Sequence, residues 1–351
     1  MSRVSQSIHI KKFLILILIC VTFTLLASFI IIGFSSNNTG FVKSIPDFFV
    51  KSKDIIFNNN NTSIINVYME KQKKVQSMNL EDYVTGVVCA EVPAKFDIEA
   101  LKAQAVAART FGAAHMESLG GHKYKSNTGA DVCDSVKCQV FMNKEDRFKS
   151  WPANSREEYW NKVTKAVKET QGEVLTYNGK LVMEPYYFSS SSGKTEDAKE
   201  VFSEDIPYLK SVNSPGEENS YKYRTTVKLN YYDFVNKINS RYSKANLSAD
   251  NVKSSVFIKS RDSSGYVKEI NVGNITLKGN QFRSVLGLNS ANFIISFENN
   301  FIQITCTGYG HDVGMSQSGA NVMAQSGKDY KQILTHYYTG VSISQIQEIK
   351  P

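Results

Sequence analysis

Residues 79–111, NLEDYVTGVVCAEVPAKFDIEALKAQAVAARTF, decide the fold of this chain. Apolar side chains recur at helical spacing over residues 83–88 and predict a helix that stops ahead of Pro93. Asp97 is expected to cap a second helix over residues 98–109. Alanine is so frequent in this second helix that another element can approach its backbone closely, so we expect it to be buried.

A single carboxylate, Glu91, ends the apolar part of the first helix. Burial among apolar neighbours raises the pKa of a carboxyl group, and a general acid that works near neutral pH needs a raised pKa. Most glutamates near helix ends are instead solvated or act as caps. Glu91 is therefore the first candidate for a catalytic acid, with a solvated or capping residue as the alternative.

The composition indicates a globular protein that works at an anionic surface. A chain of 351 residues with 11% aromatic residues is long enough for one large or two moderate domains with a real core. Its net charge of +8 is spread as mixed lysines and acids, without an arginine-rich block. This pattern favours an anionic cell wall or membrane surface over nucleic acid.

Residues 13–34, FLILILICVTFTLLASFIIIGF, are uncharged over the length needed to cross a bilayer. Basic residues precede this segment, and the next one after it is Lys43. The positive-inside rule then predicts a single-pass anchor in the cell membrane, with residues 1–12 in the cytoplasm and the rest of the chain outside. A cleaved signal peptide is the alternative.

Residues 35–63 are rich in Asn and Ser and are expected to form an extracytoplasmic tether. In residues 64–351, helical patterns and β-rich runs alternate irregularly. This alternation predicts a mixed α+β fold with a largely antiparallel sheet. The clearest hairpin signal is the Asn178-Gly179 turn between β-rich runs at 174–177 and 181–183.

A long loop after the second helix carries His122, Cys133 and Cys138. Outside the cell, two nearby thiols are expected to form a local disulfide. Together with His122 they would instead supply three Zn²⁺ ligands and leave a fourth position for water, a second histidine or a carboxylate. The spacing matches no standard zinc finger, so both interpretations stay open.

Two further segments have compositions that suit a binding groove. Residues 185–196, PYYFSSSSGKTE, place small hydroxyl residues after aromatic ones, which suits hydrogen bonding to sugars and stacking on their rings, although an ordinary serine-rich loop has the same composition. Residues 308–320, GYGHDVGMSQSGA, form a glycine-lined turn that presents His311 ahead of a helix. His311 could bind zinc, bond a substrate or Glu91, or simply satisfy the turn.

These segments resemble the stage II sporulation protein D family of a clostridial-type spore former, and the likeness extends over nearly all of the chain after the tether. The resemblance implies that Glu91 is the catalytic acid. It also implies that a substrate groove includes Ser190, Ser191, Gly193, His311 and Gln317. Lys194 stands where a second glycine is common in the family. Some clostridial members bind a metal through Cys and His in the long loop, which favours Zn²⁺ at His122, Cys133 and Cys138, where it would hold the loop beside Glu91.

The resemblance implies a lytic transglycosylase of engulfment during sporulation. It would cleave the bond between N-acetylmuramic acid and N-acetylglucosamine in peptide-stripped peptidoglycan and leave 1,6-anhydro-muramyl ends. The implied partners are an amidase-endopeptidase and a multipass scaffold of the mother-cell membrane.

Three alternatives remain. The first is a non-catalytic glycan-binding or amidase-enhancing module. A glycoside hydrolase would need a second carboxylate, for which Asp97 and Glu99 are the candidates. A Ser/His hydrolase that uses His311 and one of residues 189–192 is less favoured, because the chain has no GxSxG elbow.

Overall fold

A computed structural model describes residues 63–124 and 126–349. The predicted membrane span at residues 13–34 and nearly all of the predicted tether lie outside these residues. In the part of the chain that the structure describes, no helix is long and apolar enough to cross a membrane.

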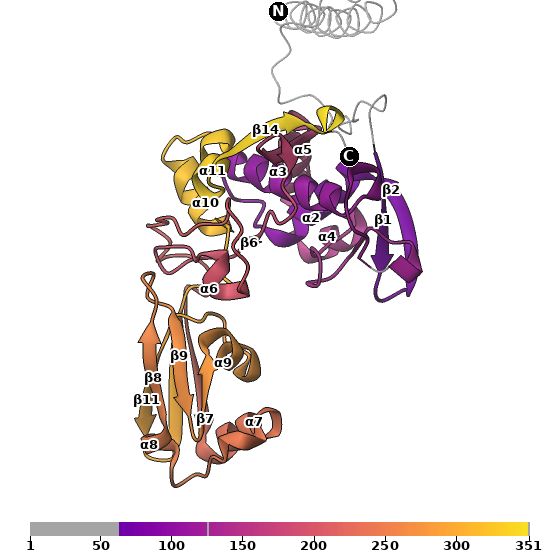
Figure 1. Ribbon diagram of the computed structural model, residues 1–351. Coiled ribbons are helices and arrows are strands. Elements are labelled where there is room, and N and C mark those ends of the chain that lie inside the picture. The colour runs from indigo at the N-terminus through magenta and orange to yellow at the C-terminus, as the bar shows by residue number, and fades with distance from the viewer. Residues whose placement is uncertain (1–62, 125, 350–351) are drawn as a thin grey trace, which may run out of the picture. The chain divides into compact units, whose positions relative to one another are not determined.

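Helices and short strands alternate along the chain, which confirms the predicted α+β class (Figure 1). The helices are α2 (Leu80–Glu91), α3 (Ile98–Ala114), α4 (Lys144–Ser150), α5 (Arg156–Glu169), α6 (Ala198–Phe202), α7 (Tyr231–Arg241), α8 (Val252–Ser255), α9 (Gly279–Leu286), α10 (Gln317–Gln325) and α11 (Tyr330–Tyr337). The strands are β1 (Ile64–Met69), β2 (Lys74–Asn79), β3 (Val132–Cys133), β4 (Glu173–Tyr177), β5 (Lys180–Leu181), β6 (Tyr187–Phe188), β7 (Arg224–Asn230), β8 (Val256–Arg261), β9 (Val267–Val272), β10 (Ile275–Lys278), β11 (Phe293–Glu298), β12 (Phe301–Thr307), β13 (Met315–Ser316) and β14 (Val341–Gln345).

The strands form several small sheets, and their pairing is largely antiparallel, as predicted. The sheets have the orders β2-β1-β3, β14-β4-β5, β13-β6, β10-β9-β8 and β11-β12-β7. Among the described strands, only β1 with β3 and β6 with β13 pair in parallel. The predicted hairpin at Asn178-Gly179 is the β4–β5 pair.

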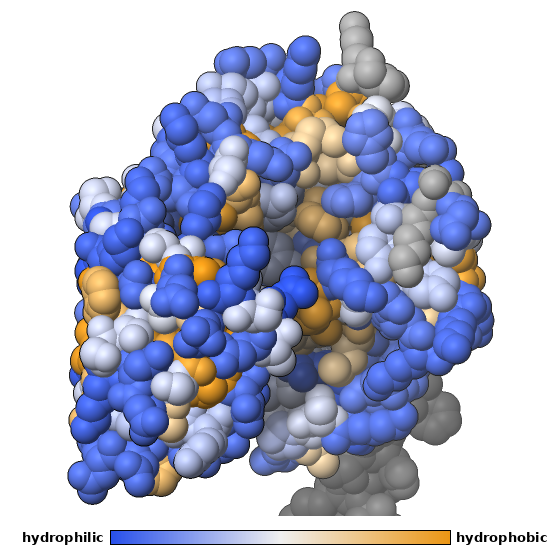
Figure 2. Space-filling view, turned by 60° about the horizontal axis from the view of Figure 1, so that its bottom comes forward, coloured by the Kyte–Doolittle hydropathy of each residue, from blue (hydrophilic) through white to orange (hydrophobic). Residues whose placement is uncertain are grey.

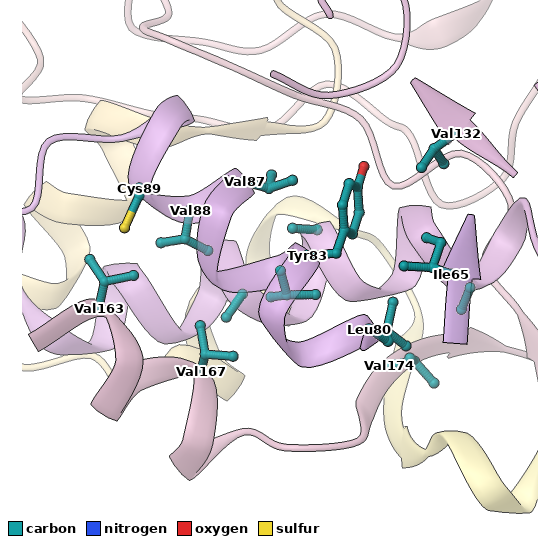
Figure 3. Close-up of a cluster of buried hydrophobic side chains, with 14 of the residues drawn as sticks. Ile65, Leu80, Tyr83, Val87, Val88, Cys89, Val132, Val163, Val167 and Val174 are labelled. Atoms are coloured by element: carbon teal, nitrogen blue, oxygen red, sulfur yellow. The ribbon is translucent and has the colours of Figure 1, made fainter. Parts of the chain in front are cut away.

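Helices α2 and α3 form as the sequence predicts and pack against each other. Asn79 caps α2, and Asp97 caps α3 by accepting a hydrogen bond from the Glu99 N–H at 2.9 Å. Side chains from α2 gather with Val163 and Val167 of α5 in the first hydrophobic cluster (Figure 3). Helix α2 is buried on nearly all sides, so the place of its C-terminal end is fixed by packing.

The alanine-rich helix α3 is shared between two cores, which confirms the prediction that it is buried. Leu101 and Ala105 belong to the first cluster, whereas Ala103 and Val106 belong to a second one that includes α10 and α11. A third cluster forms within residues 224–307, where α7 and α9 pack with β7, β9 and β12. Small side chains in α3 let these neighbours approach on both sides.

A buried ion pair ties α2 to α3. Arg109 donates to both carboxylate oxygens of Glu81, at 2.9 Å and 2.6 Å. The Arg109 side chain is fully buried, and that of Glu81 is 5% exposed. Arg109 also donates to the Val167 carbonyl at 3.2 Å, and Glu81 accepts from the Gly172 N–H at 3.1 Å. The pair therefore joins three helices and the turn that leads into β4.

Strand β2 and helix α4 leave little signal in the sequence. Strand β2 lies between β1 and α2 and pairs with β1. Its sequence, KVQSMN, is largely polar because most of the strand is exposed or half-buried. Helix α4 is short and contains no buried residue, so it leaves no apolar periodicity in the sequence.

We expect Arg109→Met to lower the free energy of unfolding by about 3–5 kcal/mol, because it leaves the buried Glu81 carboxylate without its partner. Urea denaturation of the purified chain measures this change. The matched control is Asp146→Asn, which breaks the exposed Asp146–Lys149 pair and should alter the unfolding curve little. Equal effects of the two substitutions would contradict the role given to the buried pair.

Candidate active site

The C-terminal end of α2 opens into a cavity of about 1220 Å³. Its wall combines the α2–α3 turn, residues 136–140, residues 185–189, residues 309–311 and the start of α10. Figure 2 shows a surface that is hollowed, with apolar residues gathered inside the hollow and hydrophilic residues around its rim. A volume above the range usual for small-molecule sites suits a ligand of several sugar units.

Glu91 lies in the wall of this cavity. One carboxylate oxygen accepts a hydrogen bond from the Val140 N–H at 2.7 Å. Burial raises the pKa of Glu91, while the Val140 N–H and the Gln317 side chain act against this shift. The neighbouring phenols of Tyr83 and Tyr187 are neutral, because burial raises the pKa of both well above its usual value. Glu91 thus has the desolvated, uncharged setting that a general acid requires.

The cavity wall holds aromatic rings, cations and a single acid. Its aromatic side chains are Phe96, Phe111, Trp151, Tyr159, Tyr186, Tyr187, Phe188, Phe202, Tyr221 and Tyr309, and its cationic ones are Lys95, Lys137, Arg147 and Arg283. Glu91 is the only carboxylate in the described part of this wall. Aromatic faces suit stacking on sugar rings, and the cations suit a ligand that carries negative charge.

The two acids considered as a second catalytic carboxylate have other contacts. Asp97 caps α3. Glu99 pairs with Lys102 at 2.7 Å and accepts a hydrogen bond from the Tyr330 N–H at 3.0 Å. Neither residue lines the cavity. The geometry therefore suits chemistry that needs one carboxyl group rather than two.

Several polar atoms of the wall have no partner within the described residues. They are Gln139 Nε2, Tyr187 Oη and Arg147 Nε, all buried. Each of these atoms is enclosed by the protein, and the side chains of Gln139 and Tyr187 lie close to each other. They therefore belong to the inner side of the wall and do not indicate a ligand in the cavity.

The loop predicted to bind zinc holds Glu91 through its backbone. Cys133 and Cys138 are free thiols whose sulfur atoms lie 2.9 Å apart, and Val140, two residues further on, donates to Glu91. In the described residues, no three His, Cys, Asp or Glu side chains gather as metal ligands, so His122 does not complete a set with the two thiols. Zn²⁺ at this place stays a prediction.

The serine-rich segment meets the cavity through Ser189, whereas the predicted residues Ser190, Ser191 and Gly193 are not in its wall. Ser190 and Ser191 are fully buried. The Ser191 hydroxyl donates to Glu217 at 2.7 Å. Ser191 therefore has an internal contact in place of the substrate contact that the sequence suggested.

His311 and Gln317 both line the cavity, as predicted. The His311 Nδ1 accepts a hydrogen bond from the Val313 N–H at 3.3 Å, and the ring lies among Tyr186, Phe188 and Phe202. Burial and the nearby Arg283 charge lower the pKa of His311 to about 4, so the ring is neutral near pH 7. His311 thus satisfies the turn in this structure, and its role as a substrate-binding residue stays a prediction.

Comparison with known proteins matches residues 68–177 to the family model for the stage II sporulation protein. Over 282 residues, the chain is 40% identical to "Stage II sporulation protein D" of Bacillus subtilis (strain 168), covering 80% of this chain and 79% of that protein. The chain belongs to the stage II sporulation protein D family. The Bacillus amyloliquefaciens protein "Stage II sporulation protein D" is 39% identical to this chain over 279 residues, which covers 80% of this chain and 78% of that protein.

A more distant relative carries a different name. "Amidase enhancer" of Bacillus subtilis (strain 168) is 28% identical over 309 residues, which covers 74% of this chain but 40% of that protein. The likeness thus extends beyond the stage II sporulation protein D family to a longer protein.

Glu217 is a site residue that the sequence analysis missed. It is 1% exposed, and its carboxylate accepts hydrogen bonds from the Ser191 N–H and from three hydroxyl groups at 2.6–2.7 Å. The three hydroxyls belong to Ser191, Ser214 and Ser316. Ser316 caps α10, whose first residue is Gln317. Glu217 thereby joins the serine-rich segment to the helix that faces Glu91.

Proposed function

We propose that this chain is a lytic transglycosylase that cleaves peptidoglycan glycan strands during engulfment in sporulation. The observation that carries the proposal is Glu91, a half-buried carboxyl group of raised pKa and the single acid in the described wall of a cavity lined by aromatic and cationic residues. Membership of a sporulation family and the likeness to a protein named amidase enhancer support a role at the cell wall.

The mechanism needs one acid. Protonated Glu91 gives its proton to the glycosidic oxygen between N-acetylmuramic acid and N-acetylglucosamine as the bond to the anomeric carbon breaks. The Glu91 carboxylate then takes the proton of the muramic C6 hydroxyl, whose oxygen attacks the anomeric carbon and closes the 1,6-anhydro ring. The Val140 N–H and the Gln317 side chain stabilise the carboxylate between the two steps. Hydrolysis with paired acids would need a second carboxylate in the wall.

A non-catalytic glycan-binding module is the second candidate. The relative named amidase enhancer supports it, because that name describes an effect on another enzyme. Such a module would use the same aromatic cavity and would tolerate a neutral residue in place of Glu91. The two functions therefore differ in the consequence of a single substitution.

We further propose that the protein is anchored in the mother-cell membrane by residues 13–34. It would act there with an amidase-endopeptidase that removes stem peptides and with a multipass membrane scaffold. The uncharged apolar segment and the family membership support this arrangement.

Zn²⁺ remains part of the proposal as a structural ion at the Cys133–Cys138 pair. Thiolates are preferred zinc ligands, and Cys133 and Cys138 bring two thiol groups to one place in this loop. The ion would fix the segment that leads to Val140 and thus the hydrogen bond to Glu91. The remaining ligands would have to move to the pair, because His122 does not form a group with it.

The first prediction concerns the products of peptide-free glycan strands. The wild-type chain should release anhydro-muramyl ends, detected by mass spectrometry, and Glu91→Gln should reduce their rate of formation by at least about 100-fold, since it removes the proton donor. The control is Glu157→Gln on the exposed face of α5, which should keep the wild-type rate. Reducing ends would indicate hydrolysis, and binding without cleavage by both wild type and Glu91→Gln would favour the binding module.

The second prediction concerns pH. Since Glu91 must be protonated to act and its pKa is raised, kcat/KM should fall as pH rises through this raised value. Gln317→Met removes a group that lowers the Glu91 pKa, so the fall should move to higher pH. The measurement is kcat/KM for strand cleavage against pH, with Gln303→Met on β12, outside the cavity, as control. If Gln317→Met leaves the pH profile of kcat/KM unshifted, the interaction between the Gln317 side chain and Glu91 is refuted.

The third prediction concerns metal content. Elemental analysis of the purified chain should find zinc in the wild type and less zinc in Cys133→Ser. A Cys306→Ser control alters a buried thiol of another core and should retain the metal. If the wild type holds no zinc and its intact mass is about 2 Da lower than that of the reduced chain, the two thiols form the alternative disulfide instead.

A further inference from the structure

The four cations in the cavity wall have different contacts, and the exposed Lys95 extends into solvent without a carboxylate partner in the described residues. Lys137 pairs with Glu70 at 3.1 Å. Arg147 stacks over the Trp151 ring at 4.6 Å from its centroid and donates to Ser150. Arg283 contacts no aromatic ring and forms no ion pair within the described residues. A half-buried guanidinium without a counter-charge, facing a cavity, indicates an anionic ligand.

The Arg283 side chain is oriented by the fold. It projects from α9, a helix of the third hydrophobic cluster, and its Nε donates to the Asn289 carbonyl at 3.3 Å. This bond uses one N–H of the guanidinium, and no bond is formed by its terminal nitrogens to the described protein residues. The two-pronged donor face that binds carboxylates bidentately therefore stays available.

The titratable groups that interact with Arg283 are His311, Asp312 and Cys306, and burial raises the pKa of the Cys306 thiol. His311 is neutral near pH 7, because burial lowers its pKa to about 4. Asp312 is fully buried, which raises its pKa well above the usual range and favours the neutral acid. Asp312 also bonds to Ser290 rather than to Arg283. The positive charge thus remains uncompensated beside the cavity.

Peptidoglycan offers a ligand with this charge. Every muramic acid carries a lactyl carboxyl group, which is a free carboxylate where no stem peptide is attached and a neutral amide where one is. We propose that Arg283 binds the free lactyl carboxylate of a muramic acid held in the cavity, and so determines selectivity for glycan whose stem peptides have been removed. This inference rests on the proposed function, since it assumes a glycan ligand in the cavity that contains Glu91.

A stem peptide would weaken this contact in two ways. Formation of the amide removes the negative charge, so the charge-assisted pair with the guanidinium is lost. The half-buried guanidinium would then be left without an anionic acceptor, which carries a further cost. Selectivity would therefore come from the lost carboxylate as well as from the bulk of the peptide.

The test uses two ligands that differ in the charge of the lactyl group, with only a small N-methyl amide in place of the carboxylate. Peptide-free glycan strands are compared with the same strands after carbodiimide coupling of methylamine to the lactyl carboxylates. Binding to the full chain is measured by calorimetry in the Glu91→Gln background, so that no strand is cleaved. We expect this protein to bind the carboxylate strands at least about tenfold more tightly than the amidated ones.

The deciding variant carries Arg283→Gln in addition to Glu91→Gln. Its affinity for carboxylate strands should fall to its affinity for amidated strands, so that it no longer prefers the carboxylate strands. Arg283→Lys keeps the charge without the planar donor face and should retain only part of the preference. The control Arg241→Gln removes an exposed arginine of α7 and should leave both affinities unchanged.

Persistence of the full preference in both Arg283 variants would overturn the inference, and so would equal binding of the two ligands by the Glu91→Gln parent. The outcome is separable from that of the proposed reaction. If the wild type releases no anhydro-muramyl ends but the Arg283-dependent preference is present, catalysis by Glu91 is refuted while the carboxylate subsite stands. If the wild type releases anhydro-muramyl ends but binding shows no Arg283-dependent preference, the proposed reaction stands and the carboxylate subsite is refuted.

Discussion

The buried pair of Arg109 and Glu81 is the constraint on which the rest of the structure depends. Two charges removed from water are stable only when their hydrogen bonds are nearly complete, and here the guanidinium and carboxylate are also bonded to Val167 and Gly172. These bonds leave little freedom in how α2, α3 and α5 meet. Because Glu81 and Glu91 lie in the first and last turns of α2, fixing one end of the helix also fixes where the catalytic candidate emerges.

Three separate segments then meet at Glu91. The α2–α3 turn presents the carboxyl group, the loop after Cys138 supplies the Val140 N–H, and α10 supplies Gln317. Gly319 lets α10 approach closely, since any larger residue would collide with the Tyr337 hydroxyl and Ser214. The carboxylate of Glu217 holds the start of this helix through Ser316. The surroundings of Glu91 therefore depend on tertiary packing. The position of Glu91 itself can be read from the local sequence of α2.

This division explains what the sequence could and could not predict. Helices α2 and α3, the cap at Asp97 and the position of Glu91 follow from patterns within a single stretch of chain, and they were predicted correctly. Glu217 looks like an ordinary polar loop residue, because its serine partners lie in distant segments. The hydrogen bond between Ser191 and Glu217 could not be predicted either, because the two residues are distant in the sequence. The composition of residues 185–196 suggested Ser191 as a groove residue.

The placement of charge in the cavity follows from the demands on Glu91. A cation beside this carboxyl group would stabilise its ionised form and lower its pKa, which would disfavour the protonated form that the proposed reaction needs. Burial raises the pKa of Glu91, and the two groups that lower it, the Val140 N–H and the Gln317 side chain, are uncharged. No cation is among the groups that shift this pKa, and Arg283 belongs to a different helix and a different core. Under the proposed function, one cavity can bind an anionic glycan and still keep the pKa of its acid raised, because different parts of the wall perform the two tasks.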